Sequence, residues 1–209
     1  MKLFYQYELE DLRTKLILIG EKANEAARLA IDGFLEDDLS KLNQAISLDD
    51  AIDELEVEID QASVRYITLR SPVSSDVRFI LVAIKASHDL ERAGDEAHNI
   101  ALRAKNILNQ DGRSGDTMTI KQMSQITCLM MKDAITALVE KDLELAHAVI
   151  QRDKDVNALH RENFKILTIG SADDSETSTA FQKVFISKSI ERIADHAKNL
   201  AEEVIYLLK

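Results

Sequence analysis

The chain has 209 residues, of which 45% are hydrophobic, so it is long enough to bury a substantial core. Its net charge of −11 argues against nucleic-acid binding and against direct adsorption to anionic lipid. A single cysteine excludes an intrachain disulfide and a cysteine-rich zinc site, and because we find no signal peptide or membrane span we expect a cytoplasmic protein.

One proline, few glycines and many Ala, Leu, Ile, Glu and Lys residues favour helices throughout. Pro72 ends the second predicted helix, and a glycine-containing linker over residues 109–116 separates two halves. Because the other loops are short, neighbouring helices should be antiparallel. The predicted fold class is therefore all-α, with two tandem antiparallel three-helix bundles over residues 1–110 and 116–209. The six long helices are expected over residues 3–34, 38–69, from the Pro72 turn to 109, 118–139, 142–169 and 176–208.

An eleven-residue motif occurs twice, at residues 91–101 and 191–201, and six of its positions are identical. The offset is 191 − 91 = 100 residues, which indicates an internal repeat. Read as helices, both copies place small residues on one side, which allows another helix to approach closely. Both copies also place a glutamate and an aspartate one turn apart, as Glu91 with Asp95 and as Glu191 with Asp195.

The strip that carries Glu91 and Asp95 continues through apolar residues such as Ile84, so we expect a partner helix to cover it in part. Like charges one turn apart repel by about 0.2–0.5 kcal/mol, and partial burial adds several kcal/mol per ion. Arg92 and Arg192 point about 100° away from the preceding glutamate and compensate poorly. A bound cation is the other way to relieve the repulsion.

A second acidic stripe lies on the preceding helix of each half. Asp49 and Asp53 align with Asp153 and Asn157 at an offset of 153 − 49 = 104 residues. If the helices are adjacent, two clusters form, and their oxygen ligands would suit iron, manganese, magnesium or calcium, with zinc possible. The predicted ligands are Asp49, Asp53, Glu91 and Asp95 in the first cluster and Asp153, Asn157, Glu191 and Asp195 in the second, with Glu56 and His160 as less certain members.

Acidic pairs at helical spacing are also common on solvated faces, but their presence on two helices of both halves favours a site. His88 and His98 share the strip with Glu91 and Asp95, although ordinary structural roles are favoured for both. Their counterparts are Lys188 and Lys198, which are poor ligands when charged. Asn157 and His160 also make the second cluster less anionic, so hard cations should bind there more weakly.

The run Arg70-Ser71-Pro72, followed by residues 76–78, 90–95 and 99–101, resembles the PhoU family of phosphate-signalling regulators. Residues 190–197 and 202–206 resemble it again in the second half. The resemblance implies two three-helix bundles with multinuclear iron or zinc clusters on their surfaces, held by Glu/Asp-x-x-x-Asp motifs. Asn157 departs from that motif, because it stands where a carboxylate is expected.

The resemblance further implies a cytoplasmic, often dimeric regulator that is not an enzyme. Such proteins act between the ATPase of the phosphate-specific ABC transporter and a phosphate-sensing histidine kinase, and they repress the starvation response. An alternative is a di-iron carboxylate enzyme or metal-storage protein, but that class needs Glu-x-x-His pairs, which the Glu91 and Glu191 motifs lack. A metal-free scaffold with solvated acidic strips is a third possibility. The sequence shows no catalytic nucleophile–base arrangement.

Overall fold

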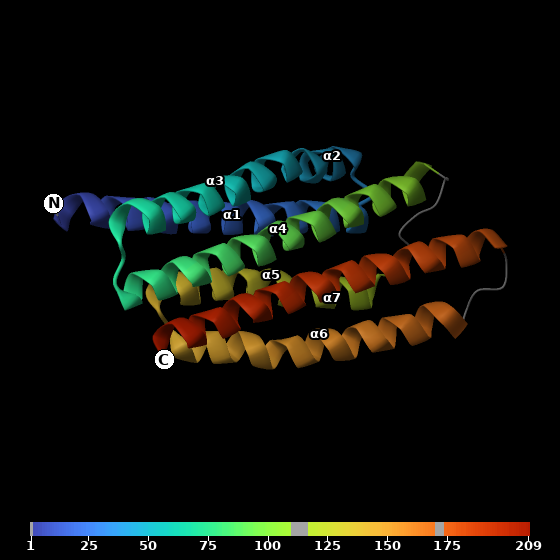
Figure 1. Ribbon diagram of the computed structural model, residues 1–209. Helices are drawn as coiled ribbons and strands as arrows, with labels where there is room; N and C mark the ends of the chain where they lie inside the picture. The colour runs from blue at the N-terminus through green and yellow to red at the C-terminus, as the bar shows by residue number, and fades with distance from the viewer. Residues whose placement is uncertain (1, 110–116, 170–173) are drawn as a thin grey trace.

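The computed structural model describes residues 2–109, 117–169 and 174–209, which form seven α-helices and no strand (Figure 1). The all-α class and the two tandem bundles are confirmed, while the predicted limits 1–110 and 116–209 remain predictions. Much of the predicted 109–116 linker lies outside the described residues. The helices are α1 (Lys2–Leu35), α2 (Leu39–Ser47), α3 (Asp49–Arg70), α4 (Ser74–Asn109), α5 (Met118–Glu140), α6 (Leu143–Ile169) and α7 (Asp174–Leu208).

The helix predicted as continuous over 38–69 is divided at Leu48 into α2 and α3, so the prediction is wrong at this position. The Leu48 N–H bonds to the carbonyl of Ala45 at 3.2 Å, three residues back, which tightens the last turn of α2. The division places Asp49 and Asp50 in the first turn of α3. Carboxylates are favoured there by the positive end of the helix dipole.

The connections that lead into α2 and α6 have the same construction. Asp37 and Lys141 adopt left-handed backbone angles, with φ of 54° and 57°. Each is followed by an aspartate, Asp38 or Asp142, whose carboxylate accepts the N–H of the residue two positions later at 2.8 and 2.9 Å. These are N-caps of the usual kind. Their separation, 142 − 38 = 104, repeats the offset between the acidic stripes, so the internal repeat extends to the backbone of the turns.

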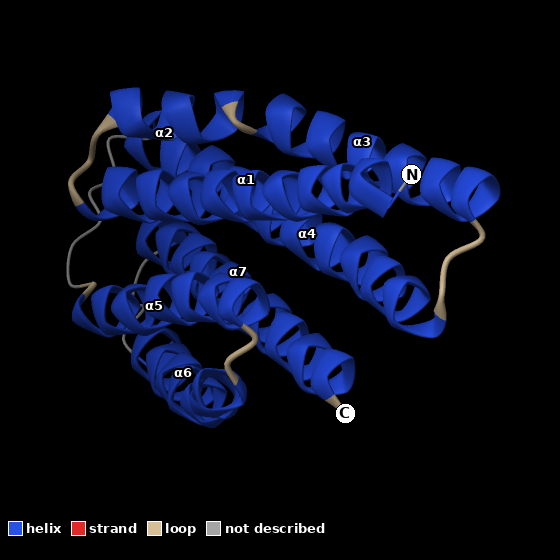
Figure 2. Ribbon diagram, turned by 90° about the vertical axis from the view of Figure 1, so that its left-hand side faces the viewer, coloured by secondary structure: helices blue, strands red, loops and turns tan. Residues whose placement is uncertain are grey.

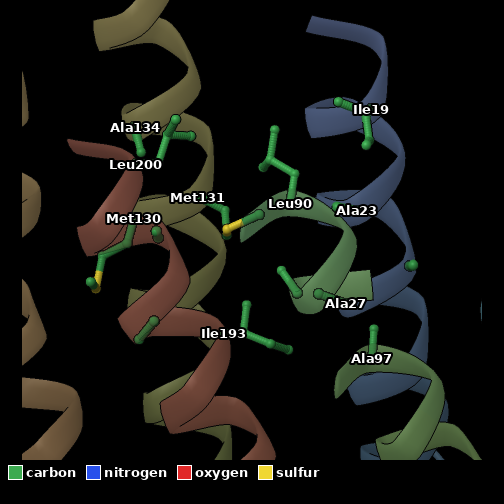
Figure 3. Packing of buried hydrophobic residues seen from close by; sticks show 14 of the residues in the cluster. Ile19, Ala23, Ala27, Leu90, Ala97, Met130, Met131, Ala134, Ile193 and Leu200 are labelled. Carbon is green, nitrogen blue, oxygen red and sulfur yellow. The ribbon is translucent and has the colours of Figure 1, made fainter. Parts of the chain in front are cut away.

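The two bundles pack against each other through their inner helices. Helices α1 and α4 of the first bundle contact α5 and α7 of the second. Helices α3 and α6 lie on opposite outer sides of the molecule in both views (Figures 1 and 2). Buried side chains of α1, α4, α5 and α7 meet in one continuous hydrophobic cluster (Figure 3). The core is therefore shared between the halves.

Two glycines mark close helix–helix contacts. A Cβ atom at Gly20 of α1 would lie 2.7 Å from Cδ1 of Ile135 on α5, so this contact joins the two halves. A Cβ atom at Gly94 of α4 would lie 3.0 Å from Cδ1 of Ile52 on α3. Gly94 thus brings α4 close to the helix that carries Asp49 and Asp53, as the small residues of the repeated motif predict.

Polar side chains bridge α4 and α7 beside the shared core. Arg192 donates to Glu96 at 2.9 Å, and Asp89 accepts from His196 and Asn199 at 2.9 and 3.1 Å. Arg192 therefore takes part in the contact between the bundles, consistent with its predicted direction away from the acidic strip. In the described part of the chain, no helix combines the length and the hydrophobicity that crossing a bilayer requires.

Candidate functional site

The first cluster (Asp49, Asp53, Glu91 and Asp95) lies between α3 and α4. Asp49 and Asp53 stand one turn apart at the start of α3, and Glu91 and Asp95 stand one turn apart in the middle of α4. Asp53 lies close enough to the other three carboxylates for their charges to interact with its own. The structure therefore brings together the four predicted residues of the first half.

Burial and like charge both act on this cluster. Burial raises the pKa of Asp53, and the Asp49 and Asp95 carboxylates raise it further. Burial likewise raises the pKa of Glu91, with Asp95 and then Asp53 adding to the effect while His88 opposes it. The Glu91 side chain is 23% exposed, yet its Oε2 atom is buried without a hydrogen-bond partner in the described part of the chain. The first cluster is thus incompletely neutralised.

His98 is the hydrogen-bonding partner that the structure adds to this cluster. Its Nδ1 atom lies 2.5 Å from Oδ2 of Asp49, and both side chains are partly buried. His88 is more distant, with Nδ1 3.9 Å from Oε2 of Glu91. Glu56, one turn beyond Asp53, is partly buried, and among the described residues it forms no hydrogen bond or ion pair. Glu56 is therefore not joined to the cluster by a direct contact.

The second cluster (Asp153, Asn157, Glu191 and Asp195) lies between α6 and α7. Asp153 is the most enclosed carboxylate, with 8% of its side chain exposed, and burial raises its pKa. Asn157 donates to Oδ2 of Asp153 at 3.0 Å, and Asp195 acts on Asp153 from α7. Asp153, Asn157 and Asp195 therefore lie together, with Asn157 serving Asp153 as a donor, whereas Glu191 lies beside Lys188 and His160.

Lysines accompany the second cluster. Nζ of Lys198 lies 3.6 Å from Asp153 and 3.9 Å from Asp195, and Lys188 pairs with Glu191. The sequence indicated both lysines only as poor ligands, so their contacts with the carboxylates were not predicted. Lys198 and Lys188 stand 100 residues after His98 and His88, at the offset of the repeated motif. This equivalence was the signal that placed them beside the carboxylates.

His160 lies at the edge of the second cluster. Its Nδ1 atom is 2.8 Å from Oγ of Ser187 on α7, and burial lowers its pKa although Glu191 opposes the shift. The neutral imidazole is therefore favoured. His160 is placed beside Glu191, as a member of the site would be, but one of its two nitrogens is occupied by Ser187.

The donor atoms of the two clusters bear on the metal that the resemblance implies. Each cluster has one carboxylate oxygen that is buried without a hydrogen-bond partner in the described part of the chain, Oε2 of Glu91 in the first and Oδ1 of Asp153 in the second. The second half offers fewer anionic donors, and lysines already contact three of its carboxylates. Within the described ranges, no three His, Cys, Asp or Glu side chains are arranged so that they could hold a metal ion. The metal ligands therefore remain predictions.

The comparison with known proteins covers almost the whole chain. The family model described as PhoU domain matches residues 16–104 and again 120–204. A protein of Pseudomonas aeruginosa named "Phosphate-specific transport system accessory protein PhoU homolog" is 31% identical over 206 residues, which is 98% of this chain and 85% of that protein. A protein of Clostridium acetobutylicum with the same name is 33% identical, over 98% of this chain and 94% of its own.

Solved structures agree with these relatives. The crystal structure of PhoU from Pseudomonas aeruginosa matches with a TM-score of 0.91 and 32% identity, and the match covers 98% of each chain. The structure of the phosphate transport system regulatory protein PhoU from Streptococcus pneumoniae matches with a TM-score of 0.89 over 98% and 97% of the two chains; at 24% identity it supports the fold alone. The repeated acidic motifs, the two bundles and these matches together show that the chain belongs to the PhoU domain family.

Proposed function

We propose that this protein regulates phosphate uptake and the phosphate-starvation response, as a cytoplasmic adaptor between a phosphate-specific ABC transporter and a sensor histidine kinase. The observation that carries the proposal is the match, over 98% of the chain, to proteins named as accessory to the phosphate-specific transport system. The two acidic clusters, each between an outer helix (α3 or α6) and an inner one (α4 or α7), would give such an adaptor charged positions for recognition. We expect contacts with the transporter ATPase and the kinase, and a homodimer.

Metal binding is the second part of the proposal. Asp49, Asp53, Glu91 and Asp95 would hold iron or zinc in the first half, with Asp153, Glu191 and Asp195 as the corresponding carboxylates in the second. A multivalent cation supplies positive charge that carboxylates alone do not. Without a bound cation the first cluster would repel an acidic partner surface, and this repulsion would fall when the charge of its carboxylates is neutralised. Docking of the partners would then depend on the charge state of the clusters.

The experiment begins with deletion of the gene, after which phosphate uptake and a starvation-responsive reporter are measured. We expect higher reporter activity at high phosphate in the deletion strain. The ATPase and the kinase should be recovered with the tagged protein under the same conditions. If neither partner is recovered and deletion leaves uptake and reporter unchanged, the adaptor function is wrong.

The role of charge is tested by the double variant Asp49→Asn with Asp95→Asn. A matched control is Glu21→Gln with Glu25→Gln, an exposed i, i+4 pair on α1 that removes the same charge away from the cluster. We expect altered partner recovery for the cluster variant and unaltered recovery for the control. Equal recovery for both would mean that the cluster does not control docking, while the adaptor role would stand.

A further inference from the structure

A small pocket lies where the four inner helices meet. Its volume is about 180 Å³, and its lining comes from α1 and α4 of the first bundle and from α5 and α7 of the second. Its most buried walls are Leu16, Leu90 and Leu200, each of them 2% exposed or less. Figure 3 shows Leu90 and Leu200 among the buried side chains where the bundles join. The pocket is therefore a site that neither bundle forms alone.

The size and the lining of the pocket select a small apolar group. Apart from four residues with polar side chains, the lining consists of aliphatic side chains and the Phe79 ring. A cavity of about 150 Å³ with walls of this kind accepts benzene, a molecule of about six non-hydrogen atoms. Pockets for drug-sized ligands are larger, at about 300–1,000 Å³. The pocket therefore suits one ring or one short alkyl chain.

The four polar residues of the pocket are Glu10, Arg13, Thr14 and Lys141. Glu10, Thr14 and Lys141 are exposed, so they mark the side on which the pocket opens to solvent. Glu10 and Arg13 pair with each other at 2.8 Å on α1. The Lys141 ammonium group forms no ion pair in the described part of the chain. The mouth thus carries two cations and one anion, on a chain whose net charge is −11.

Both cations at the mouth are placed to receive an anion. Cζ of Arg13 lies 5.0 Å from the ring centroid of Phe79, so the guanidinium lies against a wall of the pocket. Its pair with Glu10 is exposed and contributes little, and its five N–H donors leave room for a second carboxylate. Lys141 ends α5 with a left-handed φ of 57°, and its backbone N–H bonds to the carbonyl of Ala137. One cation therefore comes from each bundle.

We propose that this pocket binds a small carboxylate with a compact apolar part, such as an aromatic acid or a short fatty acid. The apolar part lies among Leu16, Leu90 and Leu200, where its removal from water favours binding. The carboxylate lies at the mouth, where Arg13 and Lys141 fix its orientation. Because both bundles line the pocket, the ligand binds only the folded, joined form and stabilises it. The pocket shares no residue with either acidic cluster, and the inference does not rest on the proposed function.

The test uses benzoate and hexanoate as probes on the full chain, with benzyl alcohol and hexanol as uncharged molecules of similar size. Binding is measured by saturation-transfer NMR and by the rise of Tm with ligand concentration at constant ionic strength. Both acids should bind, and each should bind more tightly than the matching alcohol. The difference is expected because only the acids engage Arg13 and Lys141.

A substitution at the rim tests the location of the site. Val139 lines the pocket and is 50% exposed, so Val139→Trp places an indole at the opening without changing the core. The matched control is Val57→Trp on α3, where the valine is 49% exposed and lies outside the pocket. Binding of both acids should be lost in the first variant and retained in the second. Circular dichroism confirms the helical fold of each variant before titration.

A second substitution tests the recognition of charge. Lys141→Gln should weaken binding of the acids by about two- to fivefold, because an exposed charge pair contributes modestly, and should leave the alcohols unaffected. Lys132→Gln removes the same charge from an exposed position of α5 outside the pocket and should change neither.

Three results would overturn the proposal. They are the absence of binding by either acid, equal affinities of the acids and their matching alcohols, and unchanged binding of the acids by the Val139→Trp variant. Failure of the adaptor function would be seen separately, as unchanged phosphate uptake and reporter activity after gene deletion. The two failures are therefore distinguishable.

Discussion

The first and second clusters differ in how the same acidic positions are stabilised. Asp49 stands in the first turn of α3, where the helix dipole favours a carboxylate, and an imidazole contacts it. Asp153 lies in the interior of α6, far from a helix start, and it relies on Lys198 and on the Asn157 amide. The two copies of the repeat thus keep an acidic residue at the same position. In the first copy a helix start and an imidazole stabilise it, and in the second a lysine and an amide do so.

The apolar part of the repeat differs much less. The small residues of the repeated motif are buried in both halves, including Ala97 and Ala101 in α4 and Ala197 and Ala201 in α7. They permit close packing, and a larger side chain would force the helices apart. The size of the side chain therefore limits which residues the core positions tolerate. The polar positions beside them tolerate different residues as long as the charges compensate each other.

The largest effect is expected from Gly94→Leu. The added side chain meets Ile52 on α3, and overpacking of this kind costs about 1–3 kcal/mol. For a chain of this size each kcal/mol lowers Tm by about 2–4 °C, which calorimetry measures. Gly94→Ala is the milder comparison, because its single methyl group meets Cδ1 and Cγ2 of Ile52 at 3.0 and 3.2 Å and also favours the helix. A Leu variant as stable as the Ala variant would contradict the close approach of α3 and α4.

Lys198→Met should have the next largest effect, measured with a chelator present. The substitution leaves the buried Asp153 carboxylate with only the Asn157 amide as a partner. We expect the free energy of unfolding to fall by about 1–2 kcal/mol, a modest loss because Lys198 is 31% exposed and water screens its charge. His98→Met should cost less, since Asp49 is more exposed and lies at a helix start. Adding Asp153→Asn to Lys198→Met should restore part of the loss. Equal losses for the two single variants would remove the distinction between the clusters.

Glu91→Gln should stabilise the chelated protein at pH 7, on the order of 0.5–1 kcal/mol, because it removes repulsion with Asp95 and Asp53. The pKa of Glu91 is raised in the folded state, so its carboxyl favours folding below the unfolded value of 4.5 and loses this contribution as pH rises through the folded value. The advantage of Gln should therefore disappear toward pH 4 in thermal unfolding curves. Glu191→Gln, which breaks the pair with Lys188, should instead destabilise.

The smallest effect is expected from His160→Gln. Burial lowers the pKa of His160, so its contribution to stability is present above the unfolded value of 6.5 and is lost as pH falls through the folded value. The unmodified protein should lose slightly more stability than the variant between neutral pH and pH 5. Parallel stability curves for the two proteins would show that His160 titrates as it does in the unfolded chain.

The sequence predicted the fold because each long helix carries an apolar strip with period 3.6 and because the motif occurs twice. It missed the division at Leu48, since no glycine or proline lies between residues 43 and 50 to indicate it. It placed Asp49 with Asp53 and Glu91 with Asp95 on shared helix faces, since residues four apart lie on one side of a helix, while their role as ligands stays a prediction. It could not predict the pairing of Arg192 with Glu96, because the orientation of one bundle on the other is not contained in the pattern of any single helix.

The contact of Gly20 with Ile135 has a consequence for cooperativity. Because α1 and α5 approach so closely and the core continues across this contact, opening one bundle exposes apolar surface of the other. Hydrogen exchange in the middle of α1, α4, α5 and α7 should then proceed through one common opening event, with a shared free energy. The two copies of the domain would then unfold as one unit. A substitution that destabilises either acidic cluster would lower the free energy of unfolding of the whole molecule.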